Sequence, residues 1–480
     1  MRRGAARGGK ASAALAELAG GSPARLIFKY SWPALVSMSL NALYVVVDRA
    51  FIGRGCGTDA MAGLTLAMPV MMLFGAFGVW IGAGHSSLLS IRLGEGDRVA
   101  CEKLLGELVA LKLVVFLVLP ALAYFNLDRV VDWCGGARVT PGAREAATAY
   151  LRAVMFSHLF SHLAFGLSAM LRAEGAAMRS MSCMVAGFGA NLVLDPILIF
   201  GFGLGVEGAA WATDAAMFAS CAWALLCYRP GRTAVRLRMR RISIYPRIAW
   251  RSLTVGFAPF LQQILGAAIA VSLQTAFAKW LPDEASRTAQ IASLGVFQSA
   301  LILTIMPVLG AQQGLQPVIG YNWGARNYAR VLKALKTGLV ATGALTFLAF
   351  VIQVVPPFPR LVASVFTRSG DVALLDLAAH DLALSNCMIW CIALNIVSGT
   401  YFQSIGRPAA AIFLSFLRQG LCLLPIVWIL PHFMEDKALA IWLSMPVSDV
   451  LCNVATLPPL LLHMRFLSRV RGRDGGGRAE

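Results

Sequence analysis

Long apolar runs recur along the whole chain, and they limit its possible folds more than any other feature of the sequence. A helix needs about 20 largely apolar residues to cross the hydrocarbon core of a bilayer. Runs of this length occur in both halves of the chain, separated by short polar links. We therefore expect twelve membrane-spanning helices, at residues 30–53, 61–91, 104–125, 147–171, 179–202, 208–228, 252–278, 290–320, 334–356, 379–402, 409–431 and 438–462.

The composition excludes a soluble protein and places the chain among lipids. Hydrophobic residues make up 58% and charged residues 14% of the 480 residues, so polar side chains are too few to cover a water-exposed surface. In a soluble chain the net charge of +18 would indicate a nucleic-acid partner, but here it fits basic loops beside a membrane. The ten cysteines contain no CxxC pair, and most lie in apolar runs. We expect no disulfide framework, metal site or cofactor.

Lysine and arginine gather in three segments, at residues 2–29, 229–251 and 465–478. If each half has six helices, all three segments lie on one side of the membrane. Basic segments stay on the cytoplasmic side, so both termini are predicted to be cytoplasmic. The predicted division is a disordered cytoplasmic tail (1–24), an N-terminal six-helix lobe (25–228), a basic cytoplasmic linker (229–251), a C-terminal six-helix lobe (252–463) and a basic cytoplasmic tail (464–480).

The two halves share an internal repeat. Residues Gly82–Gly96 and Gly310–Gly324 both end a helix with small residues, turn at a glycine and continue through a polar link. Pro33 and Pro259 lie near the start of the first helix of each half. Both copies begin on the same side, so the axis that relates them runs along the membrane normal. The sequence predicts an all-α membrane protein with two six-helix lobes, a pseudo-two-fold axis and a central cleft.

Four polar side chains of the first half fall inside predicted spans: Asp48, Asn191, Asp195 and Thr213. Ionisable groups at bilayer depth are costly and mark functional sites. Asn191 and Asp195 are four residues apart, which places them on one helix face. Their oxygens suit a proton or a hard cation such as Na⁺. Pro196 should leave a backbone carbonyl free beside them.

A structural role is the alternative for these acids. Asp195 would then cap or bend its helix, and Asp48 would pair with Arg49, although adjacent residues point about 100° apart on a helix. In the second half the counterpart of the Asp195 stretch is GLCLLPIV at 420–427, which keeps the proline but lacks the acid. An architectural aspartate would recur in both copies, so the N-terminal lobe is predicted to hold the cation chemistry.

Other polar residues in the spans are weaker candidates. Asp449 in the last span either supports cation or substrate binding or joins two helices by a hydrogen bond. Asp214 follows Thr213 and could face another direction. His158 and His162 have a spacing that can bind a metal, but no further ligand lies nearby in the sequence, so polar packing is favoured. Lys112 is expected to reach the membrane surface.

Five stretches in order resemble the multidrug and toxic compound extrusion (MATE) transporters. They are LYVVVDRAFIG at 43–53 with Pro33 before it, RLGEGD at 92–97, RAEGAAMRSM at 172–181, NLVLDPILIF at 191–200 and QPVIGYNWGARN at 316–327. The resemblance covers nearly all of residues 25–465. It implies an antiporter in the plasma membrane of a bacterium or archaeon, which exports organic, often cationic, compounds in exchange for H⁺ or Na⁺.

The resemblance also implies site roles by motif position. The residues are Asp48, Asn191, Asp195 and Thr213 for the cation, Tyr44 and Asn41 in support, and Pro33 for a bend in the first helix. Helix seven offers Gln262 and Gln263 but no acid, so the second-lobe acid site of other branches is in doubt here.

Two other functional classes remain as alternatives. A flippase for a lipid-linked precursor would need arginine or lysine at mid-helix in the cleft to bind pyrophosphate, whereas the sequence shows acids there. A membrane enzyme or receptor would need a clustered catalytic set or a sizeable soluble domain, and neither is visible. We expect a monomer that binds a small molecule and lipid but no nucleic acid. The sequence leaves the choice between H⁺ and Na⁺ open.

Overall fold

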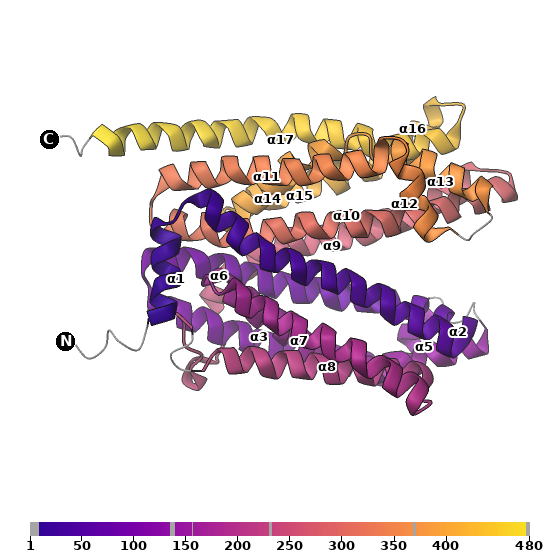
Figure 1. The fold of residues 1–480 in the computed structure, drawn as a ribbon, viewed down its shortest axis with the longest axis horizontal. Coiled ribbons are helices and arrows are strands. Elements are labelled where there is room, and N and C mark those ends of the chain that lie inside the picture. Colours follow the sequence, from indigo (N-terminus) through magenta and orange to yellow (C-terminus); the bar gives the residue numbers. More distant parts are fainter. Residues whose placement is uncertain (1–8, 135–139, 156, 230–232, 368–370, 477–480) are drawn as a thin grey trace.

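The structure is a computed structural model that describes residues 9–134, 140–155, 157–229, 233–367 and 371–476. Side chains are described for these residues except 9–14, 45–62, 65, 206 and 471–476. Every regular element in these ranges is a helix, and most helices run along the long axis of the molecule (Figure 1). The prediction of an all-α fold is therefore confirmed.

The elements divide between the two halves of the chain. Those of the first half are α1 (Gly9–Gly20), α2 (Pro23–Glu95), α3 (Arg98–Phe125), α4 (Leu127–Trp133), α5 (Pro141–Val154), α6 (Ser157–Ala173), α7 (Ala177–Pro196), η2 (Ile197–Gly201) and α8 (Gly205–Cys227). The link contains η3 (Met239–Arg241). Those of the second half are α9 (Pro246–Trp280), α10 (Glu284–Gly324), α11 (Tyr328–Val354), α12 (Phe358–Phe366), α13 (Val372–Ser385), η4 (Ile389–Cys391), α14 (Ile392–Ser404), α15 (Pro408–Phe416), η5 (Leu417–Leu423), α16 (Leu424–Phe433) and α17 (Lys437–Gly476).

Nine helices of the described part are long and apolar enough to cross a membrane, and two bent helix pairs raise this number to eleven. The predicted spans 30–53 and 61–91 both fall within α2. Both ends of α2 contact α10: the Ser31 hydroxyl donates to the Ala311 carbonyl at 3.1 Å, and Gly94 packs on the α10 backbone. The chain therefore reverses direction within α2, which accounts for two of the twelve predicted spans.

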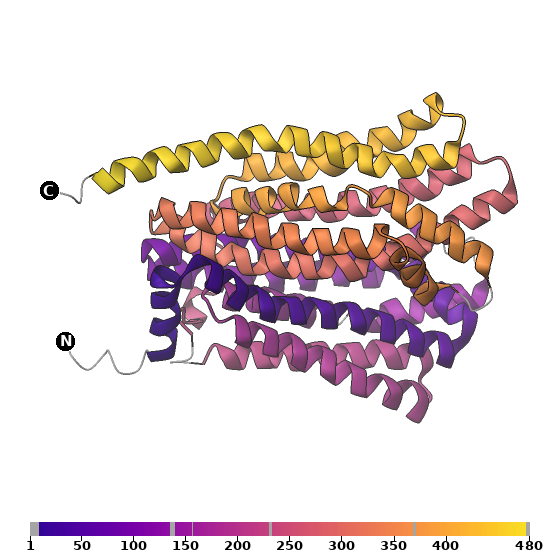
Figure 2. The ribbon, with the colours of Figure 1, turned by 45° about the horizontal axis from the view of Figure 1, so that its top comes forward.

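The two halves form two groups of helices that lie side by side. Helices α3–α8 lie below α11–α17 in Figure 1, with α2, α9 and α10 between them, and in the turned view of Figure 2 α17 again lies at the top and α7 and α8 at the bottom. Each half has its own apolar core, around Leu105 and Leu167 in the first and around Leu335 and Val397 in the second. We call the end that carries α1, residues 233–245 and the C-terminal part of α17 the basic end.

Helix α1 differs from our prediction of a disordered tail over residues 1–24. It lies across the basic end (Figure 1). Leu18 is fully buried in the core of the second half, and Leu15 packs against the cores of both halves. The guanidinium of Arg330 donates to the carbonyls of Leu18 and Gly20, at the C-terminal end of the helix. The prediction was wrong for residues 9–20, because the groups that hold α1 lie more than 300 residues later in the chain, and residues 1–8 lie outside the described residues.

The link between the halves is bound to the first half. Three glutamates of the first half hold it by ion pairs and hydrogen bonds. The contacts are Glu102 with Arg238 and Arg241, Glu107 with the backbone N–H of Tyr245, and Glu174 with the backbone N–H of Val235. The link also crosses directly over Gly106, where a Cβ would collide with the Arg241 carbonyl.

The two halves meet closely near the basic end. The Trp80 indole donates to the Leu253 carbonyl at 2.7 Å, and the Gln316 amide donates to the Ser87 hydroxyl at 2.7 Å. Among the described residues, two hydrogen bonds between the halves lie farthest from the basic end. One joins Gln313 to Met38 in the first part of α2, and the other joins Trp80 in the second part of α2 to Leu253. The halves are thus joined at one end of the bundle.

Candidate functional site

Three buried polar residues of α7 and α8 form a hydrogen-bonded group. The Asn191 amide donates to Oδ1 of Asp195 at 3.0 Å and to the hydroxyl of Thr213 at 3.4 Å. That hydroxyl also lies 3.4 Å from the hydroxyl of Tyr44 on α2, whose ring stacks on Phe188. Asn191, Asp195 and Thr213 are 1%, 0% and 7% exposed. We call these three residues the acid site, and with Tyr44 it joins three helices inside the first half.

The local sequence explains how α7 presents these groups. Asn191 and Asp195 are one helical turn apart, so they share a face as the spacing predicts. Pro196 has no N–H and disturbs the regular helical bonding around it. A π-helical turn, η2, follows at Ile197–Gly201. Such turns often occur at functional sites, because they change the direction in which side chains point.

Asp48 lies in α2, but its side chain is outside the described residues. The structure therefore places one of the two predicted acids, Asp195, with its amide and hydroxyl neighbours. That Asp48 and Asp195 share one cation stays a prediction.

Tyr44 is the supporting residue that the structure places in contact with the acid site. Asn41 is partly exposed on α2, and Gln262 and Gln263 are exposed on α9. The carbonyl of Pro33 accepts a hydrogen bond from the Ser37 hydroxyl at 2.8 Å. No hydrogen bond between described residues connects Asn41, Gln262 or Gln263 to the Asn191 group, so their roles stay predictions.

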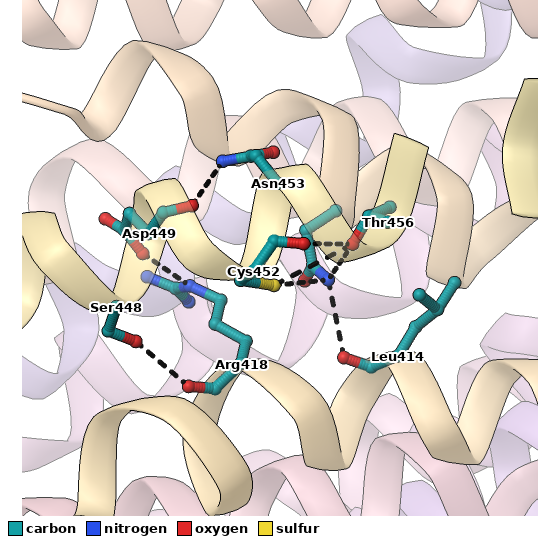
Figure 3. Close-up of polar contacts among 8 residues, drawn as sticks. Leu414, Arg418, Ser448, Asp449, Cys452, Asn453 and Thr456 are labelled. Atoms are coloured by element: carbon teal, nitrogen blue, oxygen red, sulfur yellow. Dashed lines mark hydrogen bonds and ion pairs between the residues drawn. The ribbon is translucent and has the colours of Figure 1, made fainter. Parts of the chain in front are cut away.

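Asp449 in α17 forms an ion pair with Arg418 of η5 (Figure 3). The Nε atom of Arg418 lies 3.0 Å from Oδ1 of Asp449, and the Ser448 hydroxyl donates to the Arg418 carbonyl. Next to the pair, the Asn395 amide donates toward the Thr456 hydroxyl at 3.4 Å. Sequence reasoning missed Arg418, although a single arginine within the apolar run from 409 to 431 was the signal that could have revealed it.

A second buried polar group lies between α3 and α6. Lys112 is fully buried and its ammonium donates to the Gly78 carbonyl at 3.2 Å, so it does not reach the membrane surface as we expected. The ring of His162 stacks on Phe116 and on His158. No cluster of three metal-ligating side chains occurs in the described residues. In the structure the two histidine rings pack on each other, and that of His162 packs on Phe116.

Two further acids are buried in the helices. Asp214 is 8% exposed and lies beside Ser157, where α6 begins. Asp381 on α13 accepts a hydrogen bond from the Ser293 hydroxyl at 2.6 Å. Sequence reasoning did not single out Asp381, because its helix is short and bent in the structure and its partner is on another helix.

The acid site offers one carboxylate, one amide and one hydroxyl group, and Tyr44 adds a second hydroxyl beside it. All these groups present oxygen, and none is a thiol or imidazole. Such a set can hold a proton on the carboxylate or coordinate a hard cation. It contains no nucleophile activated by a base, so acyl or phosphoryl transfer has no support in this geometry.

The MatE family model matches residues 33–197 and 260–429, one segment in each half and together more than half of the chain. Multidrug export protein MepA of Staphylococcus aureus strain N315 is 26% identical over 440 residues, which is 90% of this chain and 92% of that protein. A MepA protein of Staphylococcus saprophyticus is 22% identical over 428 residues, or 89% of this chain and 91% of that protein.

Solved structures share the fold. An outward-facing MATE family transporter of the MOP superfamily superposes with a TM-score of 0.85 at 23% identity, and covers 94% of this chain and 98% of that one. A MOP superfamily transporter from Pyrococcus furiosus gives a TM-score of 0.85 at 22% identity with the same coverage. At these identities the likeness concerns the arrangement of the helices.

Proposed function

The chain belongs to the MatE family of membrane transporters, and we propose that it is an antiporter that exports organic, cationic and amphiphilic compounds in exchange for H⁺ or Na⁺. The observation that carries the ion coupling is the buried contact of Asn191 with Asp195 and Thr213. A carboxylate without exposed surface at bilayer depth is costly unless its charge is neutralised, and a mobile cation neutralises it. The MepA relatives are multidrug export proteins, which supports the substrate class.

The orientation that we propose follows from charge. The basic end carries the arginines of residues 236–251 and the end of α17, and positive segments stay in the cytoplasm. The close contacts between the halves would then close the cytoplasmic side, and the acid site would be accessible from outside. Both termini would be cytoplasmic, in the plasma membrane of the cell.

The mechanism that we propose is an exchange between two states. In the outward-open state a cation enters and neutralises Asp195, and the drug leaves. The halves then rock so that the cytoplasmic side opens, the cation is released and a new drug binds. Coupling requires that cation and drug bind the two states with different affinities, since a ligand with equal affinity for both shifts nothing.

Export of a fluorescent organic cation from proteoliposomes, under a pH gradient or a Na⁺ gradient imposed separately, tests this function. Asp195→Asn keeps the shape and a hydrogen-bond acceptor but removes the ionisable group, so gradient-driven export should be lost. Asp376→Asn, an exposed acid paired with Arg360, is the matched control and should transport normally. Gradient-driven export by a well-expressed Asp195→Asn variant would reject the proposed coupling.

One observation favours the flippase alternative: Arg418 lies in the middle of its span, where a pyrophosphate site would need a basic residue. Its charge is compensated by Asp449 at 3.0 Å, so the pair carries no net charge. A pyrophosphate needs several uncompensated cations. Transport of a lipid-linked pyrophosphate in the same proteoliposomes would favour this alternative.

A further inference from the structure

The second half repeats the local architecture of the acid site. In the first half the fifth span, Ala177–Gly201, contains a π-helical segment next to Pro196. In the second half the corresponding span, Pro408–Phe433, contains the π-helical segment η5 next to Pro425. The helix that follows packs on this segment in both halves, α8 on η2 and α17 on η5. A π-helical segment beside a proline, with the next helix packed on it, therefore occurs in both halves. Such segments are frequent at functional sites.

The chemistry inside the two copies differs. The first copy presents a carboxylate, an amide and a hydroxyl, at Asp195, Asn191 and Thr213. The second copy presents a guanidinium, at Arg418, and a carboxylate, at Asp449. The second copy thus has a cationic group, which the first copy lacks.

Arg418 lies deep in the membrane. It is ten residues past the start of its span, or about 15 Å along the helix. A charged side chain at this depth faces the bundle interior or a water-filled space, because exposure to hydrocarbon is too costly. The Arg418 side chain keeps 24% of its surface accessible, whereas that of Asp449 keeps 9%. We therefore expect the accessible part of the Arg418 side chain to face a water-filled space in the bundle.

Asp449 uses only one edge of the guanidinium. It accepts a hydrogen bond from Nε of Arg418, which leaves the two Nη atoms. In the part of the chain that the structure describes, no residue accepts a hydrogen bond from these Nη atoms. Two parallel N–H groups of an arginine match the two oxygens of a carboxylate. The Ser448 hydroxyl holds the backbone carbonyl of Arg418, and Asp449 holds its Nε atom (Figure 3).

We propose that Arg418 binds a carboxylate of the transported compound, with Asp449 as its internal counter-ion, so that the preferred cargo is a zwitterionic amphiphile. This inference rests on the proposed function as a transporter. Asp449 limits the cost of burying the guanidinium when no cargo is present. The positive group of the cargo is then left to the acidic first half, and the carboxylate binds in the second half.

A matched pair of dyes tests the inference. Rhodamine B carries a carboxylate and a delocalised cation, and its ethyl ester keeps the cation but lacks the carboxylate. The measured quantity is the ratio of the two dyes' affinities for the purified protein and of their export rates from proteoliposomes. A ratio within one preparation is independent of how much protein has folded. The wild type should favour rhodamine B.

Three variants separate a binding role from a structural one. Arg418→Gln should reduce the ratio about tenfold or more, since it removes a charge-assisted bidentate contact. Asp449→Asn should increase the ratio, because it removes the internal competitor for the guanidinium. Arg407→Gln, an exposed arginine eleven residues earlier, immediately before the same span, is the control and should leave the ratio unchanged.

The outcomes distinguish this inference from the proposed function. If the ester is exported and Arg418→Gln lowers the affinity and the export rate of both dyes in equal proportion, the ion pair is structural. The inference then fails while the transporter function stands. A rise of the ratio in Arg418→Gln, or equal effects of Arg418→Gln and Asp449→Asn, also overturns it. If the wild type exports neither dye under any gradient, the proposed function and the inference both fail.

Discussion

Gly84 of α2 and Gly256 of α9 pack backbone to backbone where the two halves cross near the basic end. A Cβ on Gly84 would collide with the Ser252 carbonyl, and a Cβ on Gly256 would collide with the Trp80 carbonyl. Small residues allow helices in a membrane to approach this closely. The crossing therefore depends on the absence of side chains at both positions.

Gly84→Ala is expected to open this crossing. Overpacking a close contact costs about 1–3 kcal/mol, which is enough to change which of two states is populated. We expect slower export and faster hydrogen exchange over residues 246–256, measured by mass spectrometry. Gly75→Ala on the same helix meets open space and should, if anything, stabilise the helix by about 1 kcal/mol. Unchanged exchange in Gly84→Ala would show that the helices can move apart without consequence.

Thr213→Val is expected to weaken ion binding without removing any charge. Valine keeps the shape of threonine but cannot accept the hydrogen bond from Asn191, so a buried amide N–H loses a partner at a cost of about 1–3 kcal/mol. The ion concentration that gives half-maximal export should rise by about tenfold. The control is Thr275→Val on α9, where the exposed hydroxyl bonds only to its own helix. An ion dependence equal to that of the wild type would remove Thr213 from the site.

Arg330→Gln is expected to release α1 from the basic end. The guanidinium binds the carbonyls of Leu18 and Gly20, and its Nε donates to Asn322 at 2.8 Å. Without it, backbone amides in residues 9–20 should exchange faster and a protease should cut there earlier. Lys333→Gln, which changes an exposed cation on the same helix, should leave both measurements unchanged. Retained protection of α1 in Arg330→Gln would mean that other contacts, such as the packing of Leu15 and Leu18, are enough to hold the helix.

The stability of the protein in detergent should fall with rising pH through Glu174. This residue lies in the turn between α6 and α7, where burial raises its pKa from 4.5 to about 8, an effect that the hydrogen bonds from Val235 and Ala234 partly offset. Below about pH 4.5 the carboxyl is protonated in both the folded and unfolded states. As the pH rises toward 8 the unfolded state loses the proton first, so the free energy of unfolding falls.

Glu174→Gln mimics the protonated form and should flatten this dependence. The measurement is the thermal midpoint at a series of pH values, compared with the wild type. The difference between the two should grow as the pH rises toward 8 and should vanish at low pH. Parallel curves would show that Glu174 keeps its ordinary pKa in the folded protein.

The sequence predicted the helical class, the two halves and the neighbours of Asp195 for simple reasons. Apolar length is a local property, and the spacing of Asn191 and Asp195 is set within one helix. Thr213 was found because a hydroxyl in an apolar span is conspicuous. Each of these signals lies within one segment of the chain.

The sequence did not predict the features that depend on distant partners. Arg418 was overlooked because its partner, Asp449, lies 31 residues later on another helix. Helix α1 was taken as disordered because Arg330 is 312 residues away from Leu18. The π-helical segments beside Pro196 and Pro425 are changes in backbone bonding that the residue types alone do not specify.

The three glutamates that hold the link have a consequence for how the molecule can move. Glu102, Glu107 and Glu174 bind residues 235–245 to the first half. This segment should therefore move together with the first half. The link is then connected to the second half through the N-terminal end of α9, which begins at Pro246. A fluorophore placed on the link would travel with the first half, and distances from it to α17 would record the rocking directly.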